Sequence, residues 1–118
     1  MVRIFIGTSS NGEDEIAEKT LEYSLKKHSS EALDIVFMRN TKNGFMGEFS
    51  ASKWATPFSD LRWAIPEYCN FKGRAIYMDV DQLNLRDISL LYNIDLKGKA
   101  IACRPQRCCV MVMDCEKL

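Results

Sequence analysis

The N-terminal part of the chain alternates between strand-like and helix-like patterns, and this alternation restricts the fold more than any other feature. Residues 2–7 form an apolar run, and residues 13–28 carry apolar side chains at helical spacing. A second apolar run covers residues 33–38. Strand, loop, helix and strand in this order predict a right-handed βαβ unit with parallel strands. We therefore expect an α/β fold: a single Rossmann-like, three-layer domain with a mainly parallel central sheet.

Further strands and helices are predicted along the rest of the chain. Residues 39–53 are polar, contain two glycines and have no clear period, which is typical of a loop. Pro66 should bend or end a helix that begins near Thr56. The other expected elements are strands at residues 74–78, 99–103 and 109–113 and a short helix at residues 85–92. A length of 118 residues fits one domain, residues 1–118.

The charge balance and hydropathy of the chain argue against several classes of function. The 16 basic and 16 acidic residues cancel, so the chain has no general attraction to nucleic acid or to an anionic membrane. No run approaches the ~18 apolar residues of a membrane-spanning helix. The first residues enter an apolar strand at once, without the cleavage-site pattern of a signal peptide. We therefore expect a cytoplasmic protein with no membrane span and no nucleic-acid partner.

Five cysteines leave three kinds of chemistry to compare. The odd number and the lack of a secretory signal argue against a disulfide framework. A zinc site is the sharper alternative, but the chain has no C-x-x-C, and its one histidine, His28, is distant from most of the cysteines. We expect reduced and mostly buried thiols.

Two aspartates follow the apolar run at residues 74–78. Asp79 and Asp81 lie one residue apart at the expected carboxyl end of a buried strand, where open α/β sheets bind ligands. In extended backbone both side chains point to one side and Val80 to the other. Two neighbouring carboxylates repel each other unless a cation shares them, and a divalent ion prefers oxygen ligands. The alternative is that these residues are loop-edge acids that cap the next turn.

The loop at residues 7–12 connects the first strand to the first helix. Its sequence, Gly-Thr-Ser-Ser-Asn-Gly, is small and polar, so a ligand can approach the backbone N–H groups closely. The loop is not a P-loop, and it lacks the G-x-G-x-x-G pattern of dinucleotide-binding proteins. The alternative is a strand-to-helix turn that requires small residues for its geometry.

At this point the chain resembles a family. Residues 75–91, AIYMDVDQLNLRDISLL, resemble the D-x-D region of nucleotide-sugar glycosyltransferases with the glycosyltransferase-A fold, closest to the family 8 type. The likeness extends to residues 2–7 and the helix that follows, which resemble the nucleotide-binding start of that family. Residues 58–66, FSDLRWAIP, resemble its helix with an inward Arg, and residues 109–115, CVMVMDC, resemble the strand after its metal site.

The resemblance implies roles for individual residues. Asp79 and Asp81 would bind Mn²⁺ or Mg²⁺ together with the diphosphate of the donor. Arg62 would reach the phosphates or the donor sugar, which suits its forked donors; the alternative for Arg62 is a surface ion pair with Asp60 or Glu67. The remaining candidates for contact with the nucleotide are Gly7, Thr8, Ser9 and Asn11 along the uridine and the Val80 main chain at the ribose.

Family members are usually more than twice as long as this chain, and their C-terminal half supplies a further metal ligand, commonly His, and much of the acceptor site. The resemblance therefore implies a glycosyltransferase domain truncated at its acceptor half. We expect a metal-dependent hexosyltransferase that binds a UDP-sugar of the glucose or galactose type and transfers it to an unknown acceptor, with donor hydrolysis as a side reaction. The alternative is a non-catalytic nucleotide-sugar-binding module that a partner chain completes.

A short chain of this fold should leave apolar surface exposed, and exposed patches of this kind usually mark an interface. The strand at residues 109–113, with Met111, Met113 and Leu118, is the element that we expect to be uncovered. Since two-fold dimers are the commonest assemblies, we expect a homodimer that uses this C-terminal region.

Overall fold

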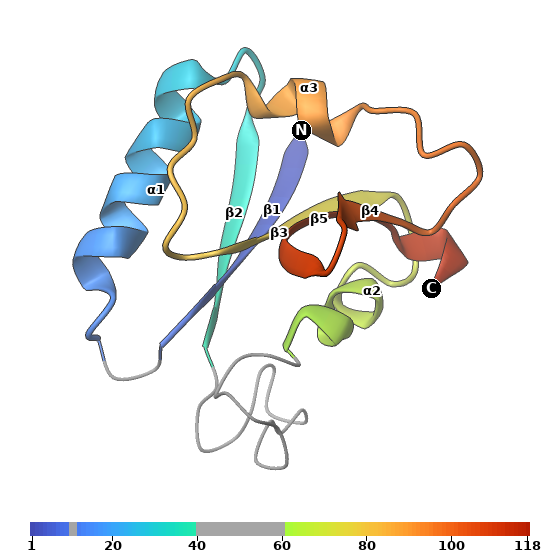
Figure 1. Cartoon of the computed structure of the whole chain (residues 1–118), viewed down its shortest axis with the longest axis horizontal. Coiled ribbons are helices and arrows are strands. Elements are labelled where there is room, and N and C mark those ends of the chain that lie inside the picture. Colours follow the sequence, from blue (N-terminus) through green and yellow to red (C-terminus); the bar gives the residue numbers. More distant parts are fainter. Residues whose placement is uncertain (10–11, 40–60) are drawn as a thin grey trace.

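The computed structural model describes residues 1–9, 12–39 and 61–118 and contains one five-stranded sheet with helices on both faces (Figure 1). The strands are β1 (Val2–Thr8), β2 (Leu33–Arg39), β3 (Arg74–Asp79), β4 (Ile101–Arg104) and β5 (Arg107–Asp114). The helices are α1 (Glu15–His28), α2 (Ile65–Tyr68) and α3 (Ile88–Tyr92), with 3₁₀ turns η1 (Leu61–Ala64) and η2 (Cys115–Lys117). None of the helices in these described ranges is long and apolar enough to cross a membrane.

The sheet has the order β2-β1-β3-β5-β4 and is mainly parallel, as predicted. β1 pairs in parallel with both β2 and β3, and α1 connects β1 to β2 in the expected βαβ unit. β5 is antiparallel to β3 and to β4, so β4 runs in the same direction as the first three strands. The parallel strands β1, β2 and β3 thus bring their carboxyl ends to one edge of the sheet.

The core has two layers, one on each face of the sheet, which confirms the three-layer prediction. Alternation along the strands sends Ile4 and Ile6 of β1 to one face and Phe5 to the other. On the first face, Leu21 and Leu25 of α1 pack over the sheet together with α3. On the second face, residues of η1, α2 and η2 cover the strands. Burial of a large aliphatic side chain contributes roughly 1.5–3 kcal/mol, so these two layers hold the strand ends in place.

One local prediction needs correction, and two others fall on residues that the structure does not describe. Pro66 does not end its helix: it lies in the first turn of α2, which continues to Tyr68, because a missing N–H costs nothing at that position. The helix start predicted near Thr56 and most of the loop predicted at residues 39–53 lie outside the described residues.

The strand that we expected to be uncovered is buried. Met111 and Met113 are 1% and 0% exposed, because β5 lies between β3 and β4 and its inner side chains pack under η1, α2 and η2. The edges of the sheet are instead β2 and β4. The expectation that Met111 and Met113 are uncovered is therefore wrong, whereas Leu118 is 43% exposed and the homodimer through the C-terminal region stays a prediction.

Candidate functional site

The candidate site lies where the carboxyl ends of β1 and β3 meet. Gly7 pairs with Asp79 across the two strands, and the Val80 N–H donates to the Gly7 carbonyl at 3.1 Å. Two segments that are far apart in sequence, the residue 7–12 loop and the D-x-D segment, are thus adjacent in space. This is the sheet edge at which open α/β folds bind ligands.

A cavity of about 180 Å³ opens at this edge and is lined by Asp14, Asp79, Val80 and Asp81. Asp79 is half-buried, and Asp81 is exposed. Val80 is 6% exposed and packs in the core layer beneath α1, so its side chain points away from the two carboxylates, as the alternation predicts. Although β3 ends at Asp79 and residues 80–81 form a turn, both aspartates line the same cavity. The cap of the next helix is Asp87, which accepts from the Ser89 N–H, and not a residue of the D-x-D segment.

Asp14 is a residue of the cavity that the sequence analysis missed. It is the N-cap residue of α1, and its carboxylate accepts a hydrogen bond from the Ser9 N–H at 3.3 Å. The acidic run at the start of the helix was the available signal, but acids at a helix N-terminus are common for reasons of the helix dipole. The fold places this third carboxylate in the lining of the same cavity as Asp79 and Asp81.

Tyr77 and Arg62 hold the inner aspartate. The Tyr77 hydroxyl donates to Asp79 Oδ1 at 2.6 Å, and Arg62 Nη2 lies 4.0 Å from the same oxygen. The Arg62 guanidinium stacks over the Tyr77 ring at 4.8 Å from its centroid and donates through Nη1 to the Cys108 carbonyl at 3.1 Å. The Arg62 side chain is only 15% exposed and lies nearest to Asp79 among the described carboxylates with which it pairs, whereas Asp60, one partner of the alternative ion pair, lies outside the described residues.

The charges of this cluster shift the acidities of its members. Burial raises the pKa of Asp79 above its ordinary value, the Tyr77 hydrogen bond and Arg62 act in the opposite direction, and Asp81 adds to the increase. Burial, together with the neighbouring Asp79 carboxylate, raises the pKa of Tyr77. Tyr77 is therefore protonated at neutral pH and acts as a donor to Asp79.

The two glycines of the residue 7–12 loop have structural reasons to be glycine. A Cβ at Gly7 would overlap the Tyr77 hydroxyl, which lies directly beside the Gly7 backbone. Gly12 has a φ of 82°, a left-handed conformation that other residues adopt only at a cost. Both observations support the reading of a turn that needs small residues, and they are compatible with close approach of a ligand.

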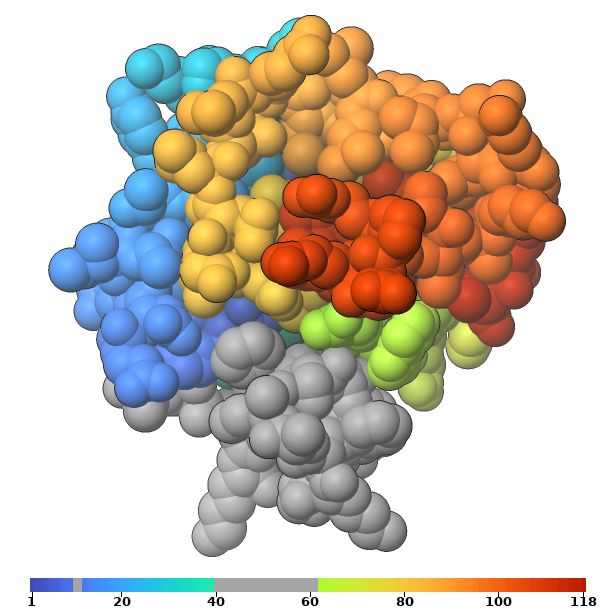
Figure 2. All heavy atoms as spheres, in the orientation of Figure 1, coloured from blue at the N-terminus to red at the C-terminus, as the bar shows by residue number. Residues whose placement is uncertain are grey.

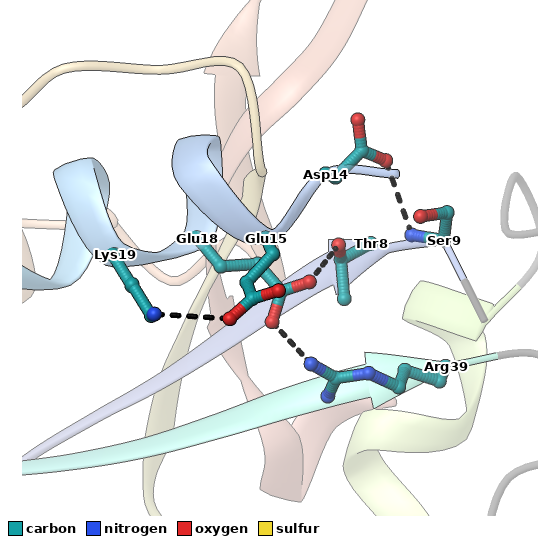
Figure 3. Close-up of polar contacts among 7 residues, drawn as sticks. All are labelled: Thr8, Ser9, Asp14, Glu15, Glu18, Lys19 and Arg39. Atoms are coloured by element: carbon teal, nitrogen blue, oxygen red, sulfur yellow. Dashed lines mark hydrogen bonds and ion pairs between the residues drawn. The ribbon is translucent and has the colours of Figure 1, made fainter. Parts of the chain in front are cut away.

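Polar contacts fix Thr8 and Ser9 against the start of α1 and the end of β2 (Figure 3). The Thr8 hydroxyl, which is fully buried, donates to Glu18 Oε2 at 3.0 Å, and Arg39 at the end of β2 donates to the other oxygen of Glu18. The Thr8 hydroxyl is thus engaged inside the protein, and Thr8 itself pairs with Arg39 at the end of β1. The Ser9 hydroxyl is buried and finds no hydrogen-bond partner within residues 1–9, 12–39 and 61–118. Asn11 lies outside the described residues.

The donor set fits a hard divalent cation better than zinc. Within residues 1–9, 12–39 and 61–118, no group of three or more His, Cys, Asp or Glu side chains lies close enough to hold a metal ion. Asp79 and Asp81 offer carboxylate oxygens, which Mn²⁺ and Mg²⁺ prefer, and a diphosphate and water would have to complete the shell. The five cysteines are free thiols, and the expectation that most are buried is wrong: only Cys69 and Cys115 are, because the others lie on or near the edge strand β4.

Comparison with known proteins was informative only at the level of structure. No protein-family model matches the sequence, and no curated protein matches it either. The chain aligns over 98% of its length with the glycosyltransferase GlyE of Streptococcus pneumoniae TIGR4, at a TM-score of 0.68 and 16% identity. It also aligns over 98% of its length with the bifunctional glycosyltransferase WbbM, at a TM-score of 0.74 and 13% identity. The galactosyltransferase LgtC, solved in complex with donor and acceptor sugar analogs, aligns with 98% of the chain at a TM-score of 0.67 and 13% identity.

The chain spans 34% of the GlyE chain, 32% of the WbbM chain and 59% of the LgtC chain. At these identities the likeness establishes the fold alone. Nearly the whole chain therefore has the fold of one part of these glycosyltransferases, which confirms the predicted architecture.

Proposed function

We propose that this chain is a metal-dependent glycosyltransferase domain of the family 8 type that binds a UDP-sugar. The observation that carries the proposal is the cavity lined by Asp79 and Asp81 beside the residue 7–12 loop, at the ligand-binding edge of a fold shared with glycosyltransferases. The fold alone does not fix a function, so the proposal depends on the chemistry of this edge.

Asp79 and Asp81 are the proposed ligands of Mn²⁺ or Mg²⁺. When bound, the metal would neutralise charge on the departing diphosphate. Asp79 is suited to this role because its position is fixed by Tyr77 and its burial makes a compensating cation favourable. Asp81 is exposed at the mouth of the cavity and can adjust to the diphosphate.

Arg62 is the proposed second source of positive charge. Its Nε is buried and has no hydrogen-bond partner among the residues that the structure describes, and its guanidinium already lies beside Asp79. A small movement of the side chain would direct its donors to a phosphate oxygen. In the proposed complex, the backbone at Gly7, Thr8 and Ser9 and the main chain of Val80 contact the nucleoside, together with Asn11.

A second function is also supported by a specific observation. The chain spans only 32% to 59% of the glycosyltransferase chains it resembles, so an acceptor site that lies elsewhere in those proteins would be absent from it. The alternative is therefore a nucleotide-sugar-binding module that a partner chain completes. In that case the chain binds a UDP-sugar but does not transfer the sugar.

Calorimetry with UDP tests the binding part of the proposal. UDP should bind more tightly with Mn²⁺ than with EDTA, and the variant Asp79→Asn/Asp81→Asn should lose this difference while keeping its fold. Asp34→Asn is a matched control, because Asp34 is exposed at the opposite end of β2. Equal UDP affinity with Mn²⁺ and with EDTA in the unchanged chain would refute the proposal. UDP release measured with and without acceptor sugars then separates transfer, donor hydrolysis and binding alone.

A further inference from the structure

A cavity with an apolar lining lies between the end of α3 and the β4–β5 hairpin. Its volume is about 450 Å³, and most of its lining is apolar, contributed by Leu91, Ile94, Ala102, Val110 and Val112. The segment that includes α3 and the tip of the hairpin, orange and orange-red, lie side by side on the visible face of the molecule (Figure 2). This cavity shares no lining residue with the cavity of the candidate site, and the proposed donor site does not use it.

A small side chain on an edge strand leaves this space open. β4 is the last strand of the sheet, and Ala102 of β4 packs on the same face of the sheet as α1 and α3. Its methyl group is too small to fill the space toward Leu91 and Ile94, which line the same cavity. Exposed apolar surface of this kind usually has a binding partner.

Hydrogen bonds hold both sides of the cavity in place. Arg74 Nη1 donates to the Tyr92 carbonyl at 3.0 Å and to the Ile94 carbonyl at 2.5 Å, and the Ile94 N–H donates to the Leu91 carbonyl at 3.2 Å. On the other side, β4 pairs with β5, with Ala102 opposite Val112. A ligand therefore meets a site that is already formed, so little binding free energy is lost in ordering the chain.

The described lining carries one charged side chain, Arg104. This residue is exposed at the end of β4. In the part of the chain that the structure describes, neither an ion pair nor a side-chain hydrogen bond engages its guanidinium. One guanidinium matches one carboxylate in charge and in the geometry of its parallel N–H donors. The cavity thus combines an apolar interior with a single group that can bind an anion.

The shape of the space favours a linear ligand. A second cavity of about 350 Å³ lies along α3, and Leu91 and Ile94 line both cavities. The second cavity is also lined by Ile88 and by Leu90, which is 60% exposed. An alkyl chain that enters beside Arg104 can therefore extend past Leu91 and Ile94 along α3.

We propose that this cavity binds a long-chain carboxylate of the fatty-acid type. The carboxylate pairs with Arg104, and the alkyl chain lies against Ala102, Leu91 and Ile94. A volume of about 300–1,000 Å³, a mostly apolar lining and a few placed polar groups are the usual properties of a small-molecule site. Neither this site nor the donor site needs the other, so the two proposals can fail separately.

Calorimetry of the full chain with octanoate, decanoate and dodecanoate tests the apolar part of the site. Each ligand is kept below its critical micelle concentration, at about 0.15 M salt, where the Debye length is about 8 Å. Affinity should rise by about 2- to 4-fold for each added methylene, since burial of one methylene contributes about 0.8 kcal/mol. Dodecyltrimethylammonium, which has the same chain and the opposite charge, should bind at least about 10-fold more weakly than dodecanoate. The proposal is overturned if dodecanoate does not bind, if affinity is independent of chain length, or if the cation binds as tightly.

Two variants with matched controls locate the ligand. Arg104→Gln should weaken dodecanoate binding by about 5- to 10-fold, while Arg107→Gln should keep it, because Arg107 pairs with Arg104 across the hairpin but does not line the cavity. Ala102→Phe should fill the cavity and weaken binding at least about 10-fold. Ile101→Phe should keep binding, because Ile101 packs on the opposite face of the sheet. Unchanged affinity in Arg104→Gln or in a folded Ala102→Phe variant overturns the proposal.

Circular dichroism establishes whether each variant is folded. Arg104 is exposed, so Arg104→Gln leaves the core intact and decides the proposal even if the larger side chain at Ala102 unfolds the chain. Light scattering tests the other possible occupant, a second copy of this chain. A dimer that dissociates in Ala102→Phe but not in Ile101→Phe would place the second copy in the cavity and overturn the proposal.

Discussion

The hydrogen bond from Tyr77 to Asp79 offers the sharpest test of how this site is built. The variant Tyr77→Phe removes the hydroxyl, which lies 2.6 Å from Asp79 Oδ1 in a fully buried side chain. The ring stays, so its stacking with Arg62 and its packing in the core are preserved. The change therefore isolates one hydrogen bond to a half-buried carboxylate.

The magnitude follows from the charge of the acceptor. Hydrogen bonds to charged groups contribute about 1.5–3 kcal/mol to stability, whereas neutral ones contribute about 0.5–1.5 kcal/mol. We expect Tyr77→Phe to lower the free energy of unfolding by about 1.5–3 kcal/mol at neutral pH. In the Asp79→Asn background the acceptor is neutral, and the cost of the same change should fall to about 0.5–1.5 kcal/mol.

The pH dependence has a definite sign. Because burial raises the pKa of Asp79 in the folded state, protonation of this carboxyl stabilises the fold. That stabilisation is fully present below the ordinary value of 3.8 and is lost as the pH rises through the higher folded value. Without the Tyr77 hydroxyl the folded pKa rises further, so the variant loses more stability over the same increase in pH. The deficit of Tyr77→Phe should thus be larger at neutral pH than at about pH 3.5.

Urea unfolding followed by circular dichroism measures these differences. Tyr92→Phe is the matched control, because the Tyr92 hydroxyl donates to a neutral acceptor, the Arg74 carbonyl, at 3.0 Å. The loss of unfolding free energy caused by Tyr92→Phe should be the same in the Asp79→Asn background as in the unchanged chain. The reasoning is refuted if the loss of unfolding free energy caused by Tyr77→Phe changes neither with pH nor in the Asp79→Asn background. Tyr77 would then contribute only through packing.

Three further predictions concern the site and the assembly. Arg62→Ala should weaken UDP-sugar binding by about 1.5–3 kcal/mol, with partial rescue by Arg62→Lys, and unchanged titration curves would remove Arg62 from the donor site. Gly7→Ala should destabilise the fold by about 1–3 kcal/mol in urea unfolding, because the new methyl group displaces the Tyr77 hydroxyl; a variant as stable as the parent would contradict this. Light scattering should detect a homodimer, and a mass of 13.5 kDa at every concentration would exclude it.

The elements that could be predicted from the sequence are those with local signals. The βαβ unit was predictable because an apolar strand, a helical period and a second strand are each visible within a short window. The position of Asp79 and Asp81 at the carboxyl end of a strand was predictable because the apolar run before them is itself a local signal. The position of Pro66 was misjudged because the same residue can end a helix or begin one, and only the change from η1 to α2 decides between them.

The contacts that make the site specific could not be predicted, because they join distant segments. Tyr77, read from the sequence, is a strand residue with an apolar neighbour on each side, and nothing nearby indicates that its hydroxyl contacts Asp79. The Cys108 carbonyl that holds Arg62 belongs to a strand 46 positions away from it. Burial of the cysteines was misjudged for a similar reason, since apolar neighbours do not reveal which strand forms the edge of a sheet.

The electrostatics of the cavity connect these observations. Asp14, Asp79 and Asp81 line one small cavity, while Arg62 lies 4.0 Å from a single oxygen and gives one of its donors to a backbone carbonyl. Burial is the largest cause of the raised pKa of Asp79 and Asp81 adds to it, while the Tyr77 hydrogen bond and Arg62 offset only part of the increase. A protein that only needed stability at this edge would gain from a neutral side chain at Asp79. The cost of keeping the carboxylates together is what makes a cation the expected partner of this edge.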